Sequence, residues 1–314
     1  MATWPPLCSH SHSHGWPLET GLSTIARVPQ IIKPFLRGRD VKRWRVDSQD
    51  LWLIFTRRGV DIDAYPACKA HLQAFRKQLE PKPADWNGKV QGAWPGRKPG
   101  IYEWFHIQDN IAYWQEFEQP KIVFPDIALS PQFAWDSRNH YLANTAYIIP
   151  RIEKWLLAVL NSSVSAWFYS QISPQIMNGY YRFIAQYVEQ IPIPPASTQQ
   201  KRCIEEVVDC VVNRISAPEY ERLLNGLVYE LFFPEDLHAK GIHLFDACAE
   251  AGITDWPAPD ETAGKKKPAT VAQLGWNLRA SSTADEIFQP NHPIYGMLFE
   301  LQSVEVVRLI EGIA

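Results

Sequence analysis

A proline-rich joint, IPIPP at residues 191–195, is the feature that most constrains the fold of this chain. Proline lacks an amide N–H and fixes its own φ, so no helix is expected to run through the joint. Before it, apolar residues come in short runs separated by glycine, proline and polar residues. After it, they recur at the spacing of amphipathic helices. We therefore expect two structural regions with a boundary near residue 195.

Short runs with β propensity dominate the first region. Three of them, at residues 121–127, 132–135 and 141–149, are separated by turn-forming residues. This pattern predicts an antiparallel β meander. A helix is expected to begin near Pro66, and apolar residues at helical spacing predict another within 155–168. The predicted fold class is therefore α+β, with helices packed on the meander.

Helices are expected throughout the second region. Ser197 and Gln200 have the spacing of a capping box, which satisfies free amide groups at a helix start. Pro218 suits the first turn of a second helix, because that turn leaves its amides unpaired. The predicted organisation is a low-complexity or truncated leader at 1–30, the α+β domain at 31–195, a helical spacer at 196–251, a linker or insertion at 252–293 and a C-terminal helix at 294–314.

Basic residues concentrate at residues 31–45, where six Lys and Arg stand against a single acid, Asp40. The whole chain has a formal net charge of −3, but residues 31–100 carry fifteen basic and seven acidic residues, whereas residues 201–314 carry ten and eighteen. Nucleic-acid phosphate is the first candidate ligand, because its neutralisation releases condensed counterions. The predicted contacts are Arg37, Arg39, Lys42 and Arg43. The alternative is a solvated basic face.

Two glycine-containing loops add aromatic and basic side chains. Residues 81–100 are dense in proline and glycine, and residues 177–187 read MNGYYRFIAQY. Long loops of this kind in compact proteins commonly carry function, and rings beside cations suit base stacking and base-edge contact. The predicted contacts in these loops are Trp86, Lys89, Trp94, Arg97, Lys98, Tyr180, Tyr181 and Arg182. A surface charge or a packing role is the alternative for each.

Ordered segments between about residues 30 and 195 resemble a known family. They read GRDVKRW, YPACKAHLQAF, IQDNIAYWQEFEQPKIVFPDI, FAWD followed by YLANTAYII, LLAVLNSS and IPIP. Together they resemble the TaqI-like C-terminal specificity domain of Type IIG restriction–modification enzymes and related adenine-specific DNA methyltransferases. The sequence IPIPPASTQQKRCIEEVV also resembles the helical spacer of Type I specificity subunits.

The resemblance implies a domain that reads double-stranded DNA in the major groove, opposite a methyltransferase domain, and helps to present a flipped adenine. It implies mixed helices and antiparallel strands with DNA-contacting loops. It assigns no base-reading residues, because these vary with the target sequence. S-adenosylmethionine and Mg²⁺ are implied only for a catalytic domain that this sequence lacks.

We find no motif for catalysis. The adenine-binding N/D/S-P-P-aromatic turn is missing, and the nearest string, NHPIY at residues 291–295, has the wrong spacing. Pro125-Asp126 has no (D/E)xK sequence after it, as a Mg²⁺-dependent nuclease of that type requires. No catalytic residue is therefore predicted, and a methyltransferase or endonuclease partner domain or subunit is expected to supply the chemistry.

The cysteines and the start of the sequence bear on its compartment. Five cysteines, odd in number and without a CxxC pair, indicate free thiols and a reducing compartment. A membrane-spanning helix needs about eighteen apolar residues in a row, and no run in this sequence is that long. We therefore expect a cytoplasmic protein without membrane contact. Alternating His10, His12 and His14 after Cys8 are expected to chelate metal only adventitiously.

The predicted function is therefore sequence-specific DNA recognition within a restriction–modification system. Three alternatives stay open at this point. The chain is a methyltransferase subunit active only with a catalytic chain, or an adaptor whose helices after residue 195 bind a protein, or a non-functional remnant. The target sequence and the oligomeric state are outside what the residues indicate.

Overall fold

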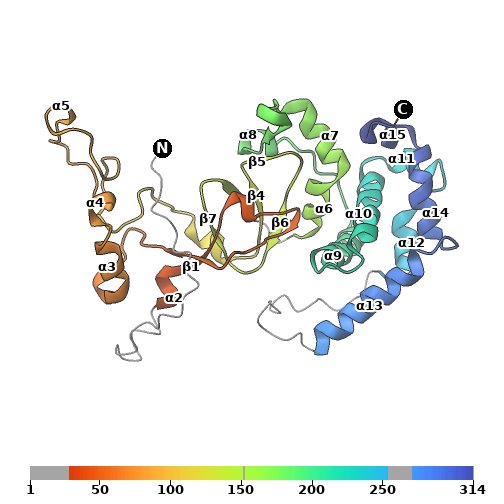
Figure 1. The fold of residues 1–314 in the computed structure, drawn as a ribbon. Coiled ribbons are helices and arrows are strands. Elements are labelled where there is room, and N and C mark those ends of the chain that lie inside the picture. Colours follow the sequence, from red (N-terminus) through yellow and green to blue (C-terminus); the bar gives the residue numbers. More distant parts are fainter. Residues whose placement is uncertain (1–27, 151–152, 254–270, 314) are drawn as a thin grey trace. The chain divides into compact units, whose positions relative to one another are not determined.

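The computed structural model describes residues 28–150, 153–253 and 271–313, which form two compact units (Figure 1). Unit 1 contains residues 28–36, 48–118 and 138–143, and unit 2 contains the other described residues. Most of the expected leader at 1–30 lies outside the described residues. Because each unit gathers separate stretches of the sequence, the boundary between them does not coincide with the joint at residue 195.

Unit 1 is built on a three-stranded sheet of order β3-β1-β7. β1 (Ile32–Leu36) pairs antiparallel with β3 (Leu51–Ile54) and parallel with β7 (Tyr141–Leu142). A small cluster of Ile31, Ile62, Tyr65 and Cys68 is buried in this unit. The unit's helices are α2 (Val28–Ile31), η2 (Ile62–Ala64), α3 (Pro66–Gln73), α4 (Arg76–Leu79), α5 (Gly88–Gln91) and η3 (Trp114–Glu118).

The sheet of unit 2 is mixed, with strand order β2-β6-β4-β8. At its centre, β4 (Lys121–Pro125) pairs antiparallel with β6 (Ala134–Asp136) and β8 (Ala146–Ile149), whereas β2 (Trp44–Arg45) joins β6 in parallel. The α+β class and the antiparallel pairing of these strands are thus confirmed, but their order is not that of the predicted meander, because β4 lies between β6 and β8. A second, two-stranded sheet pairs β5 (Ile127–Ala128) with β9 (Tyr181–Arg182).

The predicted strand at 141–149 is wrong as a single element. Tyr141–Leu142 belongs to the sheet of unit 1 and Ala146–Ile149 to that of unit 2. A close contact fixes the start of the second strand: the amide of Gly38 donates to Thr145 Oγ1 at 2.9 Å. A Cβ atom on Gly38 would lie 2.3 Å from the carbonyl oxygen of Thr145, so this position requires glycine.

Helices make up the rest of unit 2. They are η1 (Gly38–Asp40), α6 (Trp155–Asn161), α7 (Ser163–Ile172), η4 (Met177–Gly179), α8 (Ala185–Val188), α9 (Thr198–Val212), α10 (Ala217–Phe232), α11 (Pro234–His238), α12 (Leu244–Glu250), α13 (Val271–Ile287), α14 (Pro293–Glu300), η5 (Leu301–Ser303) and α15 (Glu305–Glu311). The predicted capping box is present at α9, where the Ser197 hydroxyl accepts from the Gln200 amide at 3.2 Å and the Gln200 side chain accepts from the Ser197 amide at 2.8 Å.

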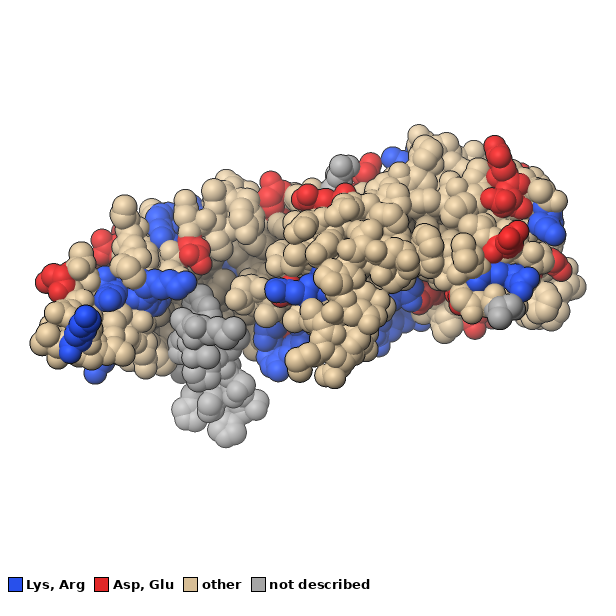
Figure 2. Space-filling model, turned by 90° about the horizontal axis from the view of Figure 1, so that it is seen from above, with Lys and Arg blue, Asp and Glu red and all other residues tan. Residues whose placement is uncertain are grey.

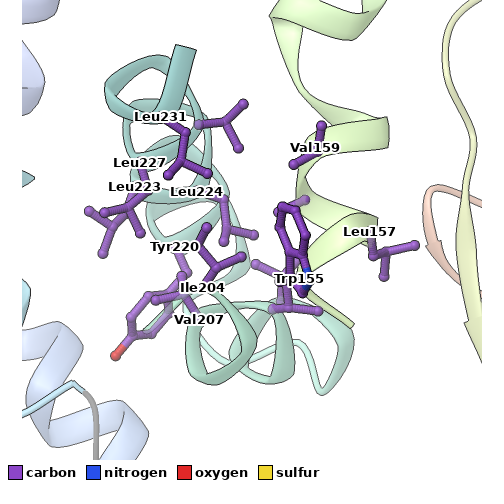
Figure 3. Packing of buried hydrophobic residues seen from close by; sticks show 14 of the residues in the cluster. Trp155, Leu157, Val159, Ile204, Val207, Tyr220, Leu223, Leu224, Leu227 and Leu231 are labelled. Atoms are coloured by element: carbon purple, nitrogen blue, oxygen red, sulfur yellow. The ribbon is translucent and has the colours of Figure 1, made fainter. Parts of the chain in front are cut away.

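One hydrophobic core runs through unit 2 on both sides of the proline joint (Figure 3). Side chains of α6, α9 and α10 point into it, among them Trp155, Ile204 and Leu227. The prolines do end the local helix, since α8 stops at Val188 and α9 begins at Thr198. They do not end the domain, because the apolar stripes of α9 and α10 are covered by residues that precede the joint.

The C-terminal part also differs from the sequence prediction. Residues 271–287, expected to lie in a linker or insertion, form α13 and bury Trp276, Ala280, Ala284 and Ile287. The expected final helix is divided by η5 into α14 and α15. Among the described residues no helix combines the length and the apolarity that crossing a membrane would require. The four described cysteines are free thiols, as predicted, and all four are buried.

Candidate nucleic-acid interface

The segment of unit 2 that carries the basic cluster is held by its own ion pair. Arg37 binds Asp40 through two contacts of 2.8 Å, from Nε to Oδ2 and from Nη2 to Oδ1, and its backbone amide donates to Oδ2 at 2.9 Å. Burial alone would raise the pKa of Asp40, but the hydrogen bonds and charge of Arg37 outweigh it and lower that pKa. The guanidinium of Arg37 is therefore largely committed to shaping η1.

Arg43 also has internal partners in unit 2. Its Nη2 donates to the carbonyl of Asn161 at 2.7 Å, its Nη1 forms an ion pair with Glu221, and its guanidinium lies 5.1 Å from the Trp44 ring centre. Burial lowers the pKa of Arg43. These contacts fix the segment 37–47 to α6 and α10, so Arg43 acts as a tether. Its side chain is 39% exposed, but its guanidinium is engaged by these internal partners, and its nucleic-acid contact stays a prediction.

Arg39 and Lys42 lie in the same segment but are exposed. Their side chains form no hydrogen bond or ion pair with the rest of the described chain. The internal pairs of Arg37 and Arg43 hold the backbone on either side of them. The segment therefore presents Arg39 and Lys42 to solvent from a fixed backbone, which reduces the conformational entropy lost when they meet a ligand.

The loop at residues 81–100 in unit 1 is ordered by Arg97. Its Nε donates to the Leu79 carbonyl at 2.6 Å, Nη1 to the His106 carbonyl at 2.6 Å and Nη2 to the Trp104 carbonyl at 2.7 Å. Burial lowers the pKa of Arg97. All three guanidinium nitrogens are thus used inside the unit. The structure gives Arg97 the role of closing the loop, and this role engages most of its donors.

Two tryptophans stabilise the same loop. The rings of Trp86 and Trp94 pack edge to face with centres 4.8 Å apart. Trp86 Nε1 donates to the Gly92 carbonyl at 3.0 Å, and Trp94 Nε1 donates to the Glu80 carbonyl at 3.1 Å. These contacts support the packing alternative for both residues. Lys89 and Lys98 remain exposed. Figure 2 shows that blue Lys and Arg side chains on this face of the molecule are interspersed with red Asp and Glu side chains.

The loop at 177–187 begins as a tight hairpin in unit 2. Gln175 and Tyr181 form an antiparallel bridge, and Ile176 N donates to Tyr180 O at 2.7 Å. Between them Asn178 and Gly179 adopt positive φ angles of 62° and 78°. Such a pair matches the primed turns that suit hairpins, and Asn-Gly is their strongest sequence signal.

The tip of this hairpin carries exposed apolar groups. Met177 is 84% exposed and Tyr180 is 37% exposed. Tyr181 accepts a hydrogen bond from Gln175 at 2.7 Å, and exposed Arg182 pairs with Asp126 at 3.0 Å. The sequence analysis selected Tyr180, Tyr181 and Arg182 but missed Met177. The Asn-Gly pair after it was the available signal that Met177 lies at a turn.

The predicted residues thus divide into two groups. The side chains with internal partners are Arg37, Arg43, Trp86, Trp94, Arg97 and Tyr181. The exposed ones are Arg39, Lys42, Lys89, Lys98, Tyr180 and Arg182, of which Arg182 is paired with Asp126. The second group, with Met177, supplies the candidate contact residues of each unit: Lys89 and Lys98 in unit 1, and Arg39, Lys42, Met177, Tyr180 and Arg182 in unit 2. Contact with DNA stays a prediction for each.

The chain belongs to the family of TaqI-like C-terminal specificity domains, which matches residues 33–193. This confirms the resemblance noted in the sequence.

Among its relatives are Type II methyltransferases. M.XhoI of Xanthomonas vasicola is 27% identical over 180 residues, which cover 55% of this chain and 31% of the relative. M.BstVI of Geobacillus stearothermophilus is 25% identical over 217 residues, covering 65% and 34%. M.PaeR7I of Pseudomonas aeruginosa is 24% identical over 189 residues, covering 58% and 30%. The chain thus spans about a third of the length of these curated relatives.

A solved structure is also similar. It is the Type IIL restriction–modification enzyme MmeI in complex with DNA, with a TM-score of 0.40 and 14% identity, covering 90% of this chain and 31% of that one.

Proposed function

We propose that this chain recognises a specific duplex DNA sequence and thereby selects the target of a restriction–modification methyltransferase. Membership of the specificity-domain family over residues 33–193 is the observation that carries the proposal. The Type II methyltransferases among its relatives support the enzyme class. The methyltransferase or endonuclease domain, with S-adenosylmethionine and Mg²⁺ as its cofactor and metal, is the partner we expect.

The exposed side chains differ in the part of DNA that each can contact. Arg39, Lys42, Lys89 and Lys98 suit phosphate contact, because each is a solvated cation on a segment fixed by internal hydrogen bonds. Phosphate contacts set register and orientation but carry no sequence information. Base recognition then falls to the hairpin tip of unit 2, where Met177 and Tyr180 offer apolar and aromatic surface.

A salt titration tests the proposal. Binding of the full chain to a pool of random-sequence duplexes is measured by fluorescence anisotropy at several salt concentrations. The double variant Arg39→Ala, Lys42→Ala is expected to bind all duplexes more weakly and to reduce the slope of log K against log salt by about 0.9 for each lost phosphate contact. A matched control is Arg202→Ala, Lys240→Ala, two exposed cations that follow the joint at residue 195.

The control is expected to leave both the affinity and the slope unchanged. If the two double variants weakened binding equally, DNA would be attracted to any surface cation and not to this segment. If the unaltered chain did not bind duplex DNA at all, DNA recognition would be refuted. Selection of a duplex motif from the pool, followed by sequencing, would then give the target.

A further inference from the structure

Three potential metal ligands meet where α10, α11 and α12 approach one another in unit 2. They are Glu230 near the end of α10, His238 at the end of α11 and His243 just before α12. One ligand atom from each residue lies within 4.8 Å of the other two. The sequence spacing, with seven residues and then four between them, matches no standard motif, and the sequence analysis passed over these residues. Their proximity arises from the fold alone.

Glu230 is held in a fixed orientation. Its side chain is only 6% exposed, and its Oε2 accepts hydrogen bonds from the amides of Leu244 at 2.7 Å and Phe245 at 3.1 Å. These amides begin α12, where a carboxylate is favoured by unpaired N–H groups. Oε1 is thereby directed at His238, whose Nε2 lies 2.9 Å away. One carboxylate oxygen is thus anchored and the other is available as a ligand.

The two imidazoles are neighbours as well. The rings of His238 and His243 stack with centres 4.3 Å apart and planes inclined by 20°. The backbone amide of His243 donates to Met297 Sδ at 3.3 Å, which fixes the chain at this point. Asp246 Oδ2 lies 4.0 Å from His243 Nδ1. This distance is too long for a hydrogen bond, but a carboxylate beside one imidazole nitrogen favours the arrangement in which the other nitrogen binds a metal.

We propose that Glu230, His238 and His243 bind a divalent ion of the Zn²⁺ class. Two imidazoles and a carboxylate are a preferred ligand set for Zn²⁺. Bonds of about 2.0–2.1 Å in a tetrahedral site separate ligand atoms by about 3.3 Å, and the 2.9 Å between Glu230 and His238 is close to that value. All three ligand atoms lie within 4.8 Å of one another, so the His243 ring must move closer to reach the tetrahedral spacing. Both histidine side chains are 43% exposed, so an ion can enter and water can complete the site.

Bound metal would cross-link three helices of unit 2. α10 supplies Glu230 from the core, whereas His238 and His243 lie on a short helix and a turn at the surface. Fixing them to one ion would stabilise the folded state by mass action, without any role in DNA contact. Without metal the same residues form a simpler structural group, in which Glu230 caps α12 and binds His238.

Metal binding is tested on the full chain by calorimetric titration with ZnCl₂ and by absorption with Co²⁺, whose visible bands report tetrahedral coordination. His10, His12 and His14 could also chelate Zn²⁺, so all measurements use a background chain with the substitutions His10→Ser, His12→Ser and His14→Ser. In this background we expect one Zn²⁺ per chain and a higher unfolding temperature in Zn²⁺ than in a chelator. His238→Ala and His243→Ala, each with partly exposed side chains, are expected to weaken binding at least about tenfold.

His71→Ala is the matched control, because it removes an exposed imidazole from α3 in unit 1. It should leave the Zn²⁺ affinity unchanged. Glu230→Gln keeps an acceptor for the amides of Leu244 and Phe245 and should weaken Zn²⁺ binding while circular dichroism stays the same. Absence of Zn²⁺ binding in the background chain, or equal Zn²⁺ affinity in the His238→Ala and His71→Ala chains, overturns the proposal. Glu230 would then only cap α12 and bind His238.

Discussion

Arg97 and Lys98 are adjacent in the sequence, yet the structure gives them opposite roles. Arg97 makes three hydrogen bonds of 2.6–2.7 Å to backbone carbonyls, whereas Lys98 is exposed. Arg97→Ala should therefore destabilise unit 1, and Lys98→Ala should weaken DNA binding without a measurable loss of stability. The pair separates a structural cation from an interface cation within one loop.

The size of the Arg97 effect follows from its contacts. A hydrogen bond to a charged group contributes about 1.5–3 kcal/mol. Three such bonds are not additive, and water enters the space left by the half-buried side chain to solvate part of the carbonyls. We therefore expect Arg97→Ala to lower the free energy of unfolding by about 2–4 kcal/mol. The loss should be local, because the three acceptors all lie within residues 79–106 of unit 1.

Urea unfolding measures the stability, and amide hydrogen exchange locates the loss. Faster exchange confined to the amides of residues 79–106 in Arg97→Ala, with normal exchange in Lys98→Ala, is the expected result. The salt dependence of DNA binding provides the second readout, and only Lys98→Ala should reduce its slope. If Arg97→Ala kept full stability and reduced that slope, Arg97 would be a phosphate contact and the assignment would be wrong.

Two further predictions concern unit 2. The pKa of Asp40 is lowered in the folded chain, so its contribution to stability is present above the unfolded pKa of about 3.9 and is lost as pH falls through the folded value. In Asp40→Asn, the free energy of unfolding measured in urea should therefore fall less steeply as the pH is lowered. Asp85→Asn, which removes an exposed acid, should leave this pH dependence unchanged. Met177 is 84% exposed, so Met177→Ala should leave stability unchanged and, by removing apolar contact, weaken specific DNA binding by about 1–2 kcal/mol with no change in salt slope. An unchanged affinity would exclude the hairpin tip from the interface.

The sequence predicted those features that depend on local patterns. Ser197 and Gln200 form the expected capping box, and the runs at 121–127 and 132–135 supply the strands β4 and β6. In each case the deciding interactions are within a few residues or follow from a short apolar run bounded by turn residues. The family was also accessible, because its segments occur in a fixed order.

Features that depend on long-range partners were not predictable in this way. The basic cluster contains Arg43, whose partners Asn161 and Glu221 lie far along the sequence, so its internal role was hidden. α13 was missed because it buries Ala280 and Ala284, small residues that produce little hydrophobic contrast, beside Trp276. The candidate metal site was missed for the same reason as Arg43, since only the packing of three helices brings its ligands together.

The chain passes between the two units several times, and this limits which exchanges of sequence between relatives the fold can tolerate. Each unit is assembled from at least three separated stretches of sequence. A genetic crossover at any single point within residues 37–143 would therefore join incompatible parts of a core, and most hybrids of two relatives would not fold. Exchange of short surface segments, such as the loop closed by Arg97 or the hairpin tipped by Met177, leaves both cores whole. Diversification is then expected to proceed by replacing loops on an inherited framework.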